Sequence, residues 1–294
     1  HNGLTGLGGQ KDFAVHQLGH ALSAKYDVAH GASLSAVWKA WANEVADTDG
    51  YARFARFGRN VWGITEEDDA AVYFSSGTTG FPKGVMLTHR NIVNNGKIIG
   101  DRMDISTADR MMIQVPMFHC FGMVLSMTNM MTHGGTIYPM PYFSPKSSLA
   151  CVNDEKITCF NGVPTMFIAM FNHADFNKTD FSHIRTGIMA GANCPPDLMR
   201  RAADEMNMKE IISVYGQTEC APGNTMSSWT DPLDVRTETV GSAFANVECK
   251  IIDPETGEDC PDGVNGEFVA RGYNIMKGYY KMPQATASAI DAEG

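Results

Sequence analysis

The sequence predicts an α/β fold with a mainly parallel sheet, preceded by an all-α segment and followed by a β-rich part. Apolar residues at helical spacing fill residues 10–62, and short apolar runs then alternate with helical patterns. Alternating strand patterns joined by turns begin near residue 238. We therefore expect three parts, at 1–66, 67–237 and 238–294.

The first part has three apolar helical faces. The clearest comprises Leu34, Val37, Trp38 and Trp41, at positions i, i+3, i+4 and i+7. An Asp-Gly pair at 49–50 separates this pattern from the third face. These residues predict an all-α segment that ends near the acidic run at 66–69.

The second part shows the alternation of a βαβ fold. The expected strands are 71–75, 111–116, 135–140, 156–161, 185–190 and 210–215. The expected helices include 89–99, 164–173 and 195–205. In the third part, VECKIID and GEFVARG are predicted to be antiparallel strands, with a turn at 254–257 between them.

Composition excludes several classes of protein. The net charge of −10 disfavours general nucleic-acid binding, because a field that gathers phosphates is absent. Seven cysteines without a CxxC pair indicate free thiols in a reducing, cytoplasmic compartment. The apolar stretch 111–131 contains Gln114, Pro116 and His119, so we expect a buried wall and no membrane span.

A glycine- and hydroxyl-rich loop follows the strand at 71–75, within YFSSGTTGFPKGVMLTHRN at 73–91. We expect this loop to lead from a strand into a helix and to present N–H groups to an anion, with Lys83 supplying a positive charge. The loop is not a Walker A motif, because Pro82 and Gly84 stand where that motif requires Gly and Ser or Thr. On its own, such a hexamer is equally compatible with a simple polar turn.

The extended string resembles the phosphate loop of the acyl-adenylate-forming superfamily, which includes acyl-CoA synthetases. Further segments match in the same order, namely PMFHCFG, GIMAGANCPP, VYGQTE, VGSAFANVECKIID and GEFVARGYNIMKGYY. The resemblance covers about residues 68–294. Within the superfamily, these segments are similar in sequence to those of medium-chain fatty acyl-CoA synthetases. It implies a truncated adenylate-forming N-terminal domain with a small β-barrel part.

The resemblance implies roles for individual residues. The β- and γ-phosphates of ATP would be held by Ser75, Ser76, Gly77, Thr78, Thr79, Gly80 and Lys83. The rest of the nucleotide would be bound by Gly191, Ala192, Tyr215, Gly216, Gln217 and Thr218. Tyr215 would lie against adenine, Thr218 would contact the α-phosphate, and Glu219 would hold Mg²⁺. The residues implied in catalysis are Lys83, Thr218 and Glu219, and His119 would border the acyl chain.

Each role has a plainer alternative. Tyr215 could be a core aromatic at a strand end, and Glu219 a solvated acid at a helix start. His119 among apolar residues could be a satisfied core histidine.

Three histidines precede the acidic run. His16 and His20 are four residues apart, but Gln17 stands where a zinc protease of the HExxH type needs its glutamate. Residues 3–65 resemble iron-containing alcohol (butanol) dehydrogenases, in which His16 and His30 would be metal ligands and His20 would lie near the nicotinamide. Two imidazoles leave a divalent metal under-coordinated, so little or no iron binding is expected from this partial iron site.

Two unrelated families therefore meet near GITEEDDAAVYF, and we expect a chimeric fragment that lacks the family's ribose-binding Asp and mobile lid. The expected function is ATP-dependent activation of a medium-chain fatty acid to acyl-AMP and then acyl-CoA, with ATP, Mg²⁺ and coenzyme A as ligands. The fragment alone is expected to turn over weakly or not at all. An oxidoreductase fragment and a non-catalytic nucleotide-binding fragment remain as alternatives.

Overall fold

The computed structural model describes residues 65, 67–75 and 82–291. The chain divides into two units, His1–Thr65 and Glu66–Gly294, and all the described residues except Thr65 belong to the second unit. The predicted all-α segment and its histidines lie outside the described residues. The loop segment 76–81 lies outside them as well.

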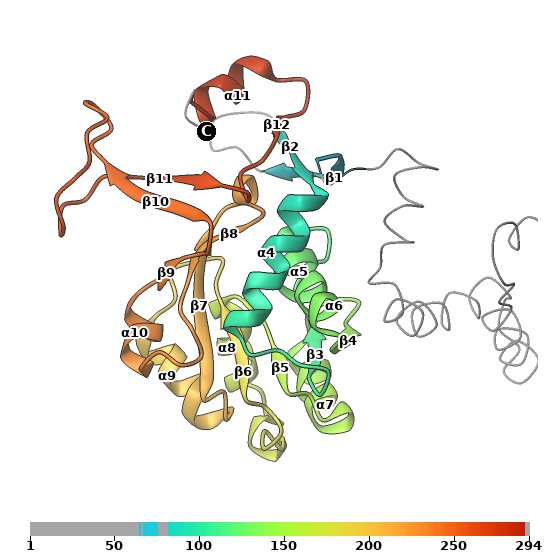
Figure 1. Ribbon diagram of the computed structural model, residues 1–294. Coiled ribbons are helices and arrows are strands. Elements are labelled where there is room, and N and C mark those ends of the chain that lie inside the picture. Colours follow the sequence, from blue (N-terminus) through green and yellow to red (C-terminus); the bar gives the residue numbers. More distant parts are fainter. Residues whose placement is uncertain (1–64, 66, 76–81, 292–294) are drawn as a thin grey trace, which may run out of the picture. The chain divides into compact units, whose positions relative to one another are not determined.

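The second unit is built around a seven-stranded sheet in the order β4-β3-β5-β6-β7-β8-β9 (Figure 1). The first five strands of this order run parallel, and β8 and β9 extend the sheet antiparallel. The strands are β3 (Arg110–Ile113), β4 (Thr136–Pro139), β5 (Cys159–Phe160), β6 (Thr186–Met189), β7 (Glu210–Gly216), β8 (Gly223–Met226) and β9 (Ser242–Ala243). The prediction of a mainly parallel α/β sheet is confirmed.

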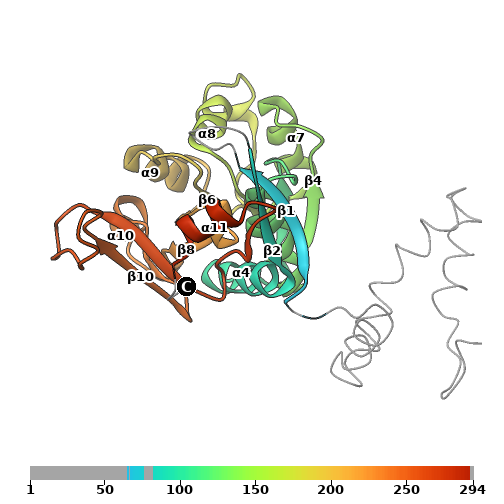
Figure 2. The ribbon, with the colours of Figure 1, turned by 90° about the horizontal axis from the view of Figure 1, so that it is seen from above.

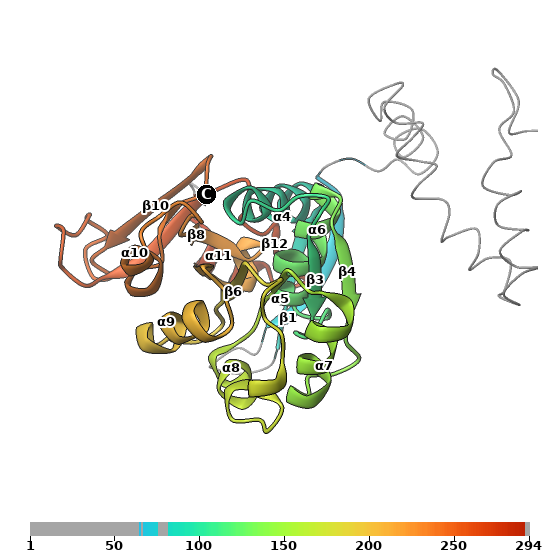
Figure 3. The same ribbon diagram turned by 90° about the horizontal axis from the view of Figure 1, so that it is seen from below.

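Helices cover both faces of this sheet (Figure 3). Because successive strand residues point to opposite faces, Met112 packs with α7, α8 and α9, whereas Met111 and Ile113 pack with α4, α5 and α6. The α-helices are α4 (His89–Arg102), α5 (Cys120–Gly122), α6 (Asn129–His133), α7 (Pro145–Glu155), α8 (Pro164–Phe171), α9 (Pro196–Glu205), α10 (Leu233–Glu238) and α11 (Pro283–Ala289). The other helical segments are the π-helix η3 (Met123–Thr128) and the 3₁₀ turns η4 (Phe176–Lys178) and η5 (Thr218–Cys220).

The methionine-rich stretch 111–131 is divided between a strand and helices. It begins in β3, leaves the sheet at Gln114, and continues through α5 and η3 into α6. Met111, Phe121 and Met130 of this stretch pack in the core with Ile99 of α4, whereas Met112 packs on the other face of the sheet and Phe118 is exposed. Within residues 65, 67–75 and 82–291, no helix combines the length and the apolar character that a membrane crossing requires.

A second, three-stranded sheet has the order β1-β2-β12 and is antiparallel throughout. It consists of β1 (Asp69–Ser75), β2 (Lys83–Thr88) and β12 (Gly278–Tyr279). The expectation that the glycine-rich loop leads directly into a helix is therefore wrong, because the loop connects the two strands of a β-hairpin. Lys83–Thr88 forms a strand since its alternate residues Val85 and Leu87 are fully buried.

Helix α4 begins only after this second strand. Thr88 caps it, accepting a hydrogen bond from the Asn91 N–H at 3.2 Å, and the Asn91 side chain accepts from the Thr88 N–H at 2.7 Å. This reciprocal cap ends the strand and starts the helix within one residue.

The β-rich part after residue 238 is shared among three sheets. Strand β9 extends the large sheet and β12 joins the hairpin sheet, while β10 (Val247–Ile252) and β11 (Glu267–Gly272) pair only with each other. The predicted antiparallel pair is thus confirmed. In Figure 2, α11 lies between the β10–β11 ribbon and the β1–β2 ribbon.

Candidate nucleotide site

The base of the β-hairpin brings together the two ends of the predicted phosphate loop. Ser75 and Lys83 are paired across β1 and β2, and the Ser75 hydroxyl donates to the Lys83 carbonyl at 3.5 Å. The residues from Ser76 to Gly80 lie outside the described part of the chain. The hairpin therefore fixes where the loop leaves and re-enters the sheet.

Glu219 lies across from this hairpin, in the turn after β7. Its carboxylate accepts a hydrogen bond from the Tyr279 hydroxyl at 2.8 Å, and its main-chain carbonyl accepts one from the Met276 N–H at 2.7 Å. Burial, together with the bond to Glu219, raises the pKa of Tyr279 to about 12. Glu219 is thus a held carboxylate rather than a freely solvated one.

Lys83 reaches the same cluster from β2. Its ammonium group lies 4.7 Å from the centre of the Tyr279 ring. A cation from the hairpin and a carboxylate from the β7 turn therefore contact the same tyrosine. This is the structural link between the predicted phosphate-binding lysine and the predicted metal-binding glutamate.

Thr218 is joined to the segment that carries His119. The Cys120 thiol donates to the Thr218 hydroxyl at 3.6 Å, and burial raises the pKa of Cys120, which keeps the thiol protonated. Cys120 begins α5, directly after His119. Cys120 therefore connects Thr218, the predicted contact of the α-phosphate, to His119, the predicted residue of the acyl pocket.

His119 is exposed and caps α5. Its Nδ1 accepts a hydrogen bond from the Phe121 N–H at 3.0 Å. Desolvation lowers the pKa of His119, and a proton on Nδ1 would also break the cap. The structure therefore favours a neutral imidazole with its proton on Nε2, and the exposed position differs from that of a buried core histidine.

Tyr215 and Gln217 continue β7 toward Glu219. Tyr215 is 44% exposed, and its ring meets Phe268 of β11 edge-on at 5.1 Å between centroids. A planar ring with this much accessible surface can stack on a base, whereas a core aromatic could not. Gly216, between them, allows a close approach, because an added Cβ would lie 1.8 Å from the Pro222 carbonyl oxygen.

Gly191 and Ala192 follow β6 at the same carboxyl edge of the sheet. Gly191 has a φ of +81°, a conformation that side-chain-bearing residues rarely adopt. A Cβ there would also approach Val163 at 3.1 Å. The turn is exposed, so its main chain is accessible to a ligand.

A cavity of about 610 Å³ lies beside this cluster, between the β7 turn, the β10–β11 pair and α11. Gln217, Glu219 and Tyr279 line it, and the remaining wall includes Lys250 and Arg271. This volume is in the range of small-molecule sites. The cavity lies next to Glu219, and the exposed ring of Tyr215 is not part of its wall.

The residues of this site fit a metal ion that is coordinated mainly by the phosphate oxygens of a bound nucleotide. Among the described residues there is no group of three or more His, Cys, Asp or Glu side chains that could enclose an ion. Mg²⁺ in nucleotide sites is commonly held by one or two carboxylates, phosphate oxygens and water. A single held carboxylate at Glu219 meets that requirement. His16 and His30, the predicted partial iron site, lie outside the described residues.

Several residues that join the segments around the candidate site have no role in the sequence prediction. Tyr279 was assigned no role, and neither were the buried asparagines of α4. The Asn91 amide donates to the Ile275 carbonyl at 3.0 Å, and Asn95 exchanges hydrogen bonds with Gly223 at 2.9 and 3.1 Å. Polar residues on a helix are normally expected to face solvent. The sequence therefore gives no signal that these asparagine side chains are buried beside the site.

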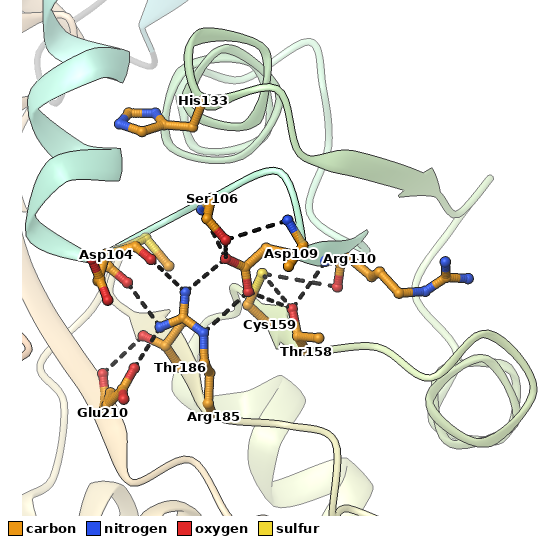
Figure 4. Close-up of polar contacts among 12 residues, drawn as sticks. Asp104, Ser106, Asp109, Arg110, His133, Thr158, Cys159, Arg185, Thr186 and Glu210 are labelled. Carbon is orange, nitrogen blue, oxygen red and sulfur yellow. Dashed lines mark hydrogen bonds and ion pairs between the residues drawn. The ribbon is translucent and has the colours of Figure 1, made fainter.

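A different polar cluster lies at the opposite edge of the sheet, and Figure 4 shows its side chains and their contacts. Arg185 binds both carboxylate oxygens of Asp109, at 3.1 and 2.7 Å, and contacts Glu210 at 2.5 Å. Thr158 donates to Asp109 at 2.7 Å. These residues lie where β3, β5, β6 and β7 begin, whereas the candidate site lies where β6 and β7 end. The cluster is therefore a structural one.

Comparison with known proteins agrees with this arrangement. Residues 16–280 match the family described as AMP-binding enzyme. The putative acyl-CoA synthetase YngI of Bacillus subtilis is 47% identical over 221 residues, covering 75% of this chain and 40% of that protein. The mitochondrial medium-chain acyl-CoA ligase ACSF2 of Mus musculus is 40% identical over 228 residues, covering 76% of this chain and 37% of that protein.

Solved structures show the same fold. ATP-bound MatB from Rhodopseudomonas palustris has a TM-score of 0.71 at 28% identity, covering 79% of this chain and 45% of that chain. The long-chain-fatty-acid-CoA ligase FadD1 from Archaeoglobus fulgidus has a TM-score of 0.68 at 30% identity, covering 78% of this chain and 47% of that chain. The chain thus spans about 40% of the length of its curated relatives.

The family match extends over most of the sequence, and the fold and the sequence similarity to acyl-CoA ligases agree with it. This chain belongs to the AMP-binding enzyme family.

Proposed function

We propose that this chain forms the nucleotide-binding core of an enzyme that activates a medium-chain fatty acid with ATP. In the first step, a carboxylate oxygen of the acid bonds to the α-phosphorus, and the bond from that phosphorus to the bridging oxygen breaks to release pyrophosphate. In the second step, the coenzyme A thiol loses its proton to solvent and its sulfur bonds to the acyl carbon, and the bond from that carbon to the phosphate oxygen breaks to release AMP. The contacts of Tyr279 with both Lys83 and Glu219 are the observation that carries this proposal.

The proposed residue roles combine this geometry with the resemblance of the loop to the phosphate loop of the superfamily. The hairpin loop from Ser75 to Gly80 holds the β- and γ-phosphates through its main-chain N–H groups and hydroxyls, and Lys83 adds charge beside them. Glu219 holds Mg²⁺, which supplies charge neutralisation at the phosphates when it is bound.

The remaining roles concern the nucleoside and the acid. Tyr215, Gly191 and Ala192 bind the adenine side, and Thr218 contacts the α-phosphate. Gly216 and Gln217 shape the turn between them. His119 borders the acyl chain, where a neutral imidazole costs less to desolvate than a charged one.

The relatives support the substrate class. One curated relative is named a medium-chain acyl-CoA ligase and another an acyl-CoA synthetase, and a structural neighbour was solved with ATP bound. Because the chain spans about 40% of its curated relatives, we propose that the 294 residues alone turn over weakly. Closing elements normally position the substrate and exclude water.

We also propose that the division near residue 66 separates parts of different origin. The alternative of an oxidoreductase fragment rests on the resemblance of residues 3–65 to iron-containing alcohol dehydrogenases. The match to the AMP-binding enzyme family begins at residue 16, within that segment. Aldehyde-dependent oxidation of NAD(P)H by this chain would support that alternative. ATP binding without pyrophosphate exchange would support the alternative of a non-catalytic nucleotide-binding fragment.

The test is ATP–pyrophosphate exchange, measured with fatty acids of graded length, together with ATP binding by calorimetry. The wild type is compared with Lys83→Ala and with Lys281→Ala, a matched lysine that lies 5.1 Å from the Tyr280 ring. We expect Lys83→Ala to weaken MgATP binding by roughly tenfold, equivalent to about 1.4 kcal/mol, and Lys281→Ala to leave it unchanged. Equal binding by all three proteins would contradict the proposed role of Lys83.

A further inference from the structure

Two adjacent tyrosines of this chain have opposite environments. Tyr279 is 7% exposed, whereas Tyr280 is 51% exposed. Tyr279 is the last residue of β12 and pairs with Val85 of β2. Since side chains alternate along a strand, only one of the two can face the site, and the pairing with β2 selects Tyr279.

The Tyr279 hydroxyl is aimed at the Glu219 carboxylate from fixed backbone. The Tyr279 N–H donates to the Thr286 hydroxyl at 2.9 Å, which ties β12 to α11. The Met276 N–H donates to the Glu219 carbonyl at 2.7 Å, which ties the segment before β12 to the β7 turn. The donor and its acceptor are therefore each held by their main chains, so their 2.8 Å contact is a built feature.

The contact uses one oxygen of the carboxylate. Within the described residues, the Tyr279 hydroxyl is the side chain that hydrogen-bonds to this carboxylate, and it does so through Oε1. A hydrogen bond to one oxygen restricts the rotation of the carboxylate and so sets the direction of its other oxygen. This is how residues behind a metal ligand set its orientation.

We propose that Tyr279 is a positioning residue that orients the Glu219 carboxylate toward the metal ion of bound MgATP. This inference rests on the proposed function, because it needs the nucleotide to bind beside Glu219. Lys83, which lies over the ring of the same tyrosine, contacts the face of the ring rather than its hydroxyl. The hydroxyl and the ring therefore have separate roles, toward the carboxylate and toward the lysine.

Two substitutions separate these roles. Tyr279→Phe removes the hydroxyl and keeps the ring, and Tyr279→Leu removes both. Tyr280→Phe is the matched control, because it removes an exposed hydroxyl at the next residue. Glu219→Gln removes the charge of the metal-binding group itself.

The probe is Mn²⁺, a paramagnetic substitute for Mg²⁺, titrated by electron paramagnetic resonance in the presence of a non-hydrolysable ATP analogue. We expect Tyr279→Phe to weaken Mn²⁺ binding about tenfold and to leave the metal-free affinity for the analogue unchanged. Tyr279→Leu should weaken Mn²⁺ binding to the same extent and also lower the metal-free affinity about 2- to 5-fold, because the lysine loses its ring. Tyr280→Phe should match the wild type.

A general loss of structure would produce a different pattern, lowering metal-free and metal-dependent binding together. In the Glu219→Gln background, Tyr279→Phe should have no further effect on Mn²⁺ affinity. If Glu219→Gln weakens Mn²⁺ binding but Tyr279→Phe and Tyr280→Phe both match the wild type, the inference about Tyr279 is overturned and the proposed function stands. If Glu219→Gln also matches the wild type, the proposed metal site itself is wrong, and the inference falls with it.

Discussion

Arg185 uses all of its N–H donors at the amino edge of the sheet, where the parallel strands β3, β5, β6 and β7 begin. Its five N–H groups reach Asp109 twice, Glu210, and the carbonyls of Met103 and Asp104 (Figure 4). Burial alone would raise the pKa of Asp109, but the Arg185 guanidinium and the Thr158 hydroxyl lower it below its usual range. The ion pair therefore stabilises the fold only while Asp109 is ionised.

We expect Asp109→Asn to lower the free energy of unfolding by about 3 kcal/mol at neutral pH, because it leaves a half-buried guanidinium without its main partner. The folded pKa of Asp109 is depressed, so the stabilisation is complete above the unfolded value of about 3.9 and is lost as the pH falls through the folded value. Urea denaturation at several pH values between 7 and 3.5 measures the difference from the wild type.

The control is Asp175→Asn, which removes an ion pair with Lys178 at the surface. It should unfold near the wild type at every pH, because exposed pairs contribute little. A difference between wild type and Asp109→Asn that stays constant down to pH 3.5 would contradict the pKa assignment.

At the scale of elements, two segments hold the candidate site in place. Helix α4 uses Asn91 and Asn95 to bind the segments around 275 and 223, and the β7 turn passes so close to Pro222 that Gly216 has no room for a side chain. The site is therefore a product of packing between elements that are distant in the sequence.

We expect Gly216→Ala to disturb the turn that carries Thr218 and Glu219, because the new Cβ would lie 1.8 Å from a carbonyl oxygen. Main-chain movement is the only relief, so MgATP affinity should fall by roughly tenfold or more. Calorimetry measures it, alongside the melting temperature.

Gly257→Ala is the control at a turn with a φ of +75° and no atom within 4 Å of the new Cβ. It should cost about 1 kcal/mol of stability and leave MgATP affinity unchanged. Unaltered affinity in Gly216→Ala would show that the turn does not position the nucleotide groups.

Elements with strong periodicity could be predicted from sequence. The apolar runs at 185–190 and 210–215 became β6 and β7 within a residue or two, and the helix expected at 195–205 became α9. Strand β2 was missed because Lys83–Thr88 is short and merges with the cap of α4. Helix α7 was missed as well, since its sequence PKSSLACVNDE has little apolar periodicity.

The motif residues of the site could be identified from local sequence, but their contacts could not. Glu219 stands within a recognisable string, whereas its bond to Tyr279 joins residues 60 positions apart. That bond depends on the pairing of β12 with β2, which no local pattern specifies. Tandem tyrosines predict that one of them faces inward, without indicating which.

For the molecule as a whole, the two edges of the central sheet have different roles. The amino edge carries the satisfied ion-pair network around Arg185, and the carboxyl edge carries the turns with Gly191 and Glu219. Ligands of open α/β sheets bind at the carboxyl ends of the strands. Stability and the proposed function can therefore be changed separately, as the expected effects of Asp109→Asn and Tyr279→Phe illustrate.

We propose that the hairpin loop between Ser75 and Lys83 holds the β- and γ-phosphates of ATP, while the β7 turn binds the rest of the nucleotide. Hydrogen–deuterium exchange of the whole chain, followed by mass spectrometry, tests this directly with MgATP and with AMP. We predict that MgATP protects peptides covering 75–83 and 214–219, and that AMP, which lacks the β- and γ-phosphates, protects only 214–219. Protection at 214–219 alone with both nucleotides, or at neither segment, would contradict the account.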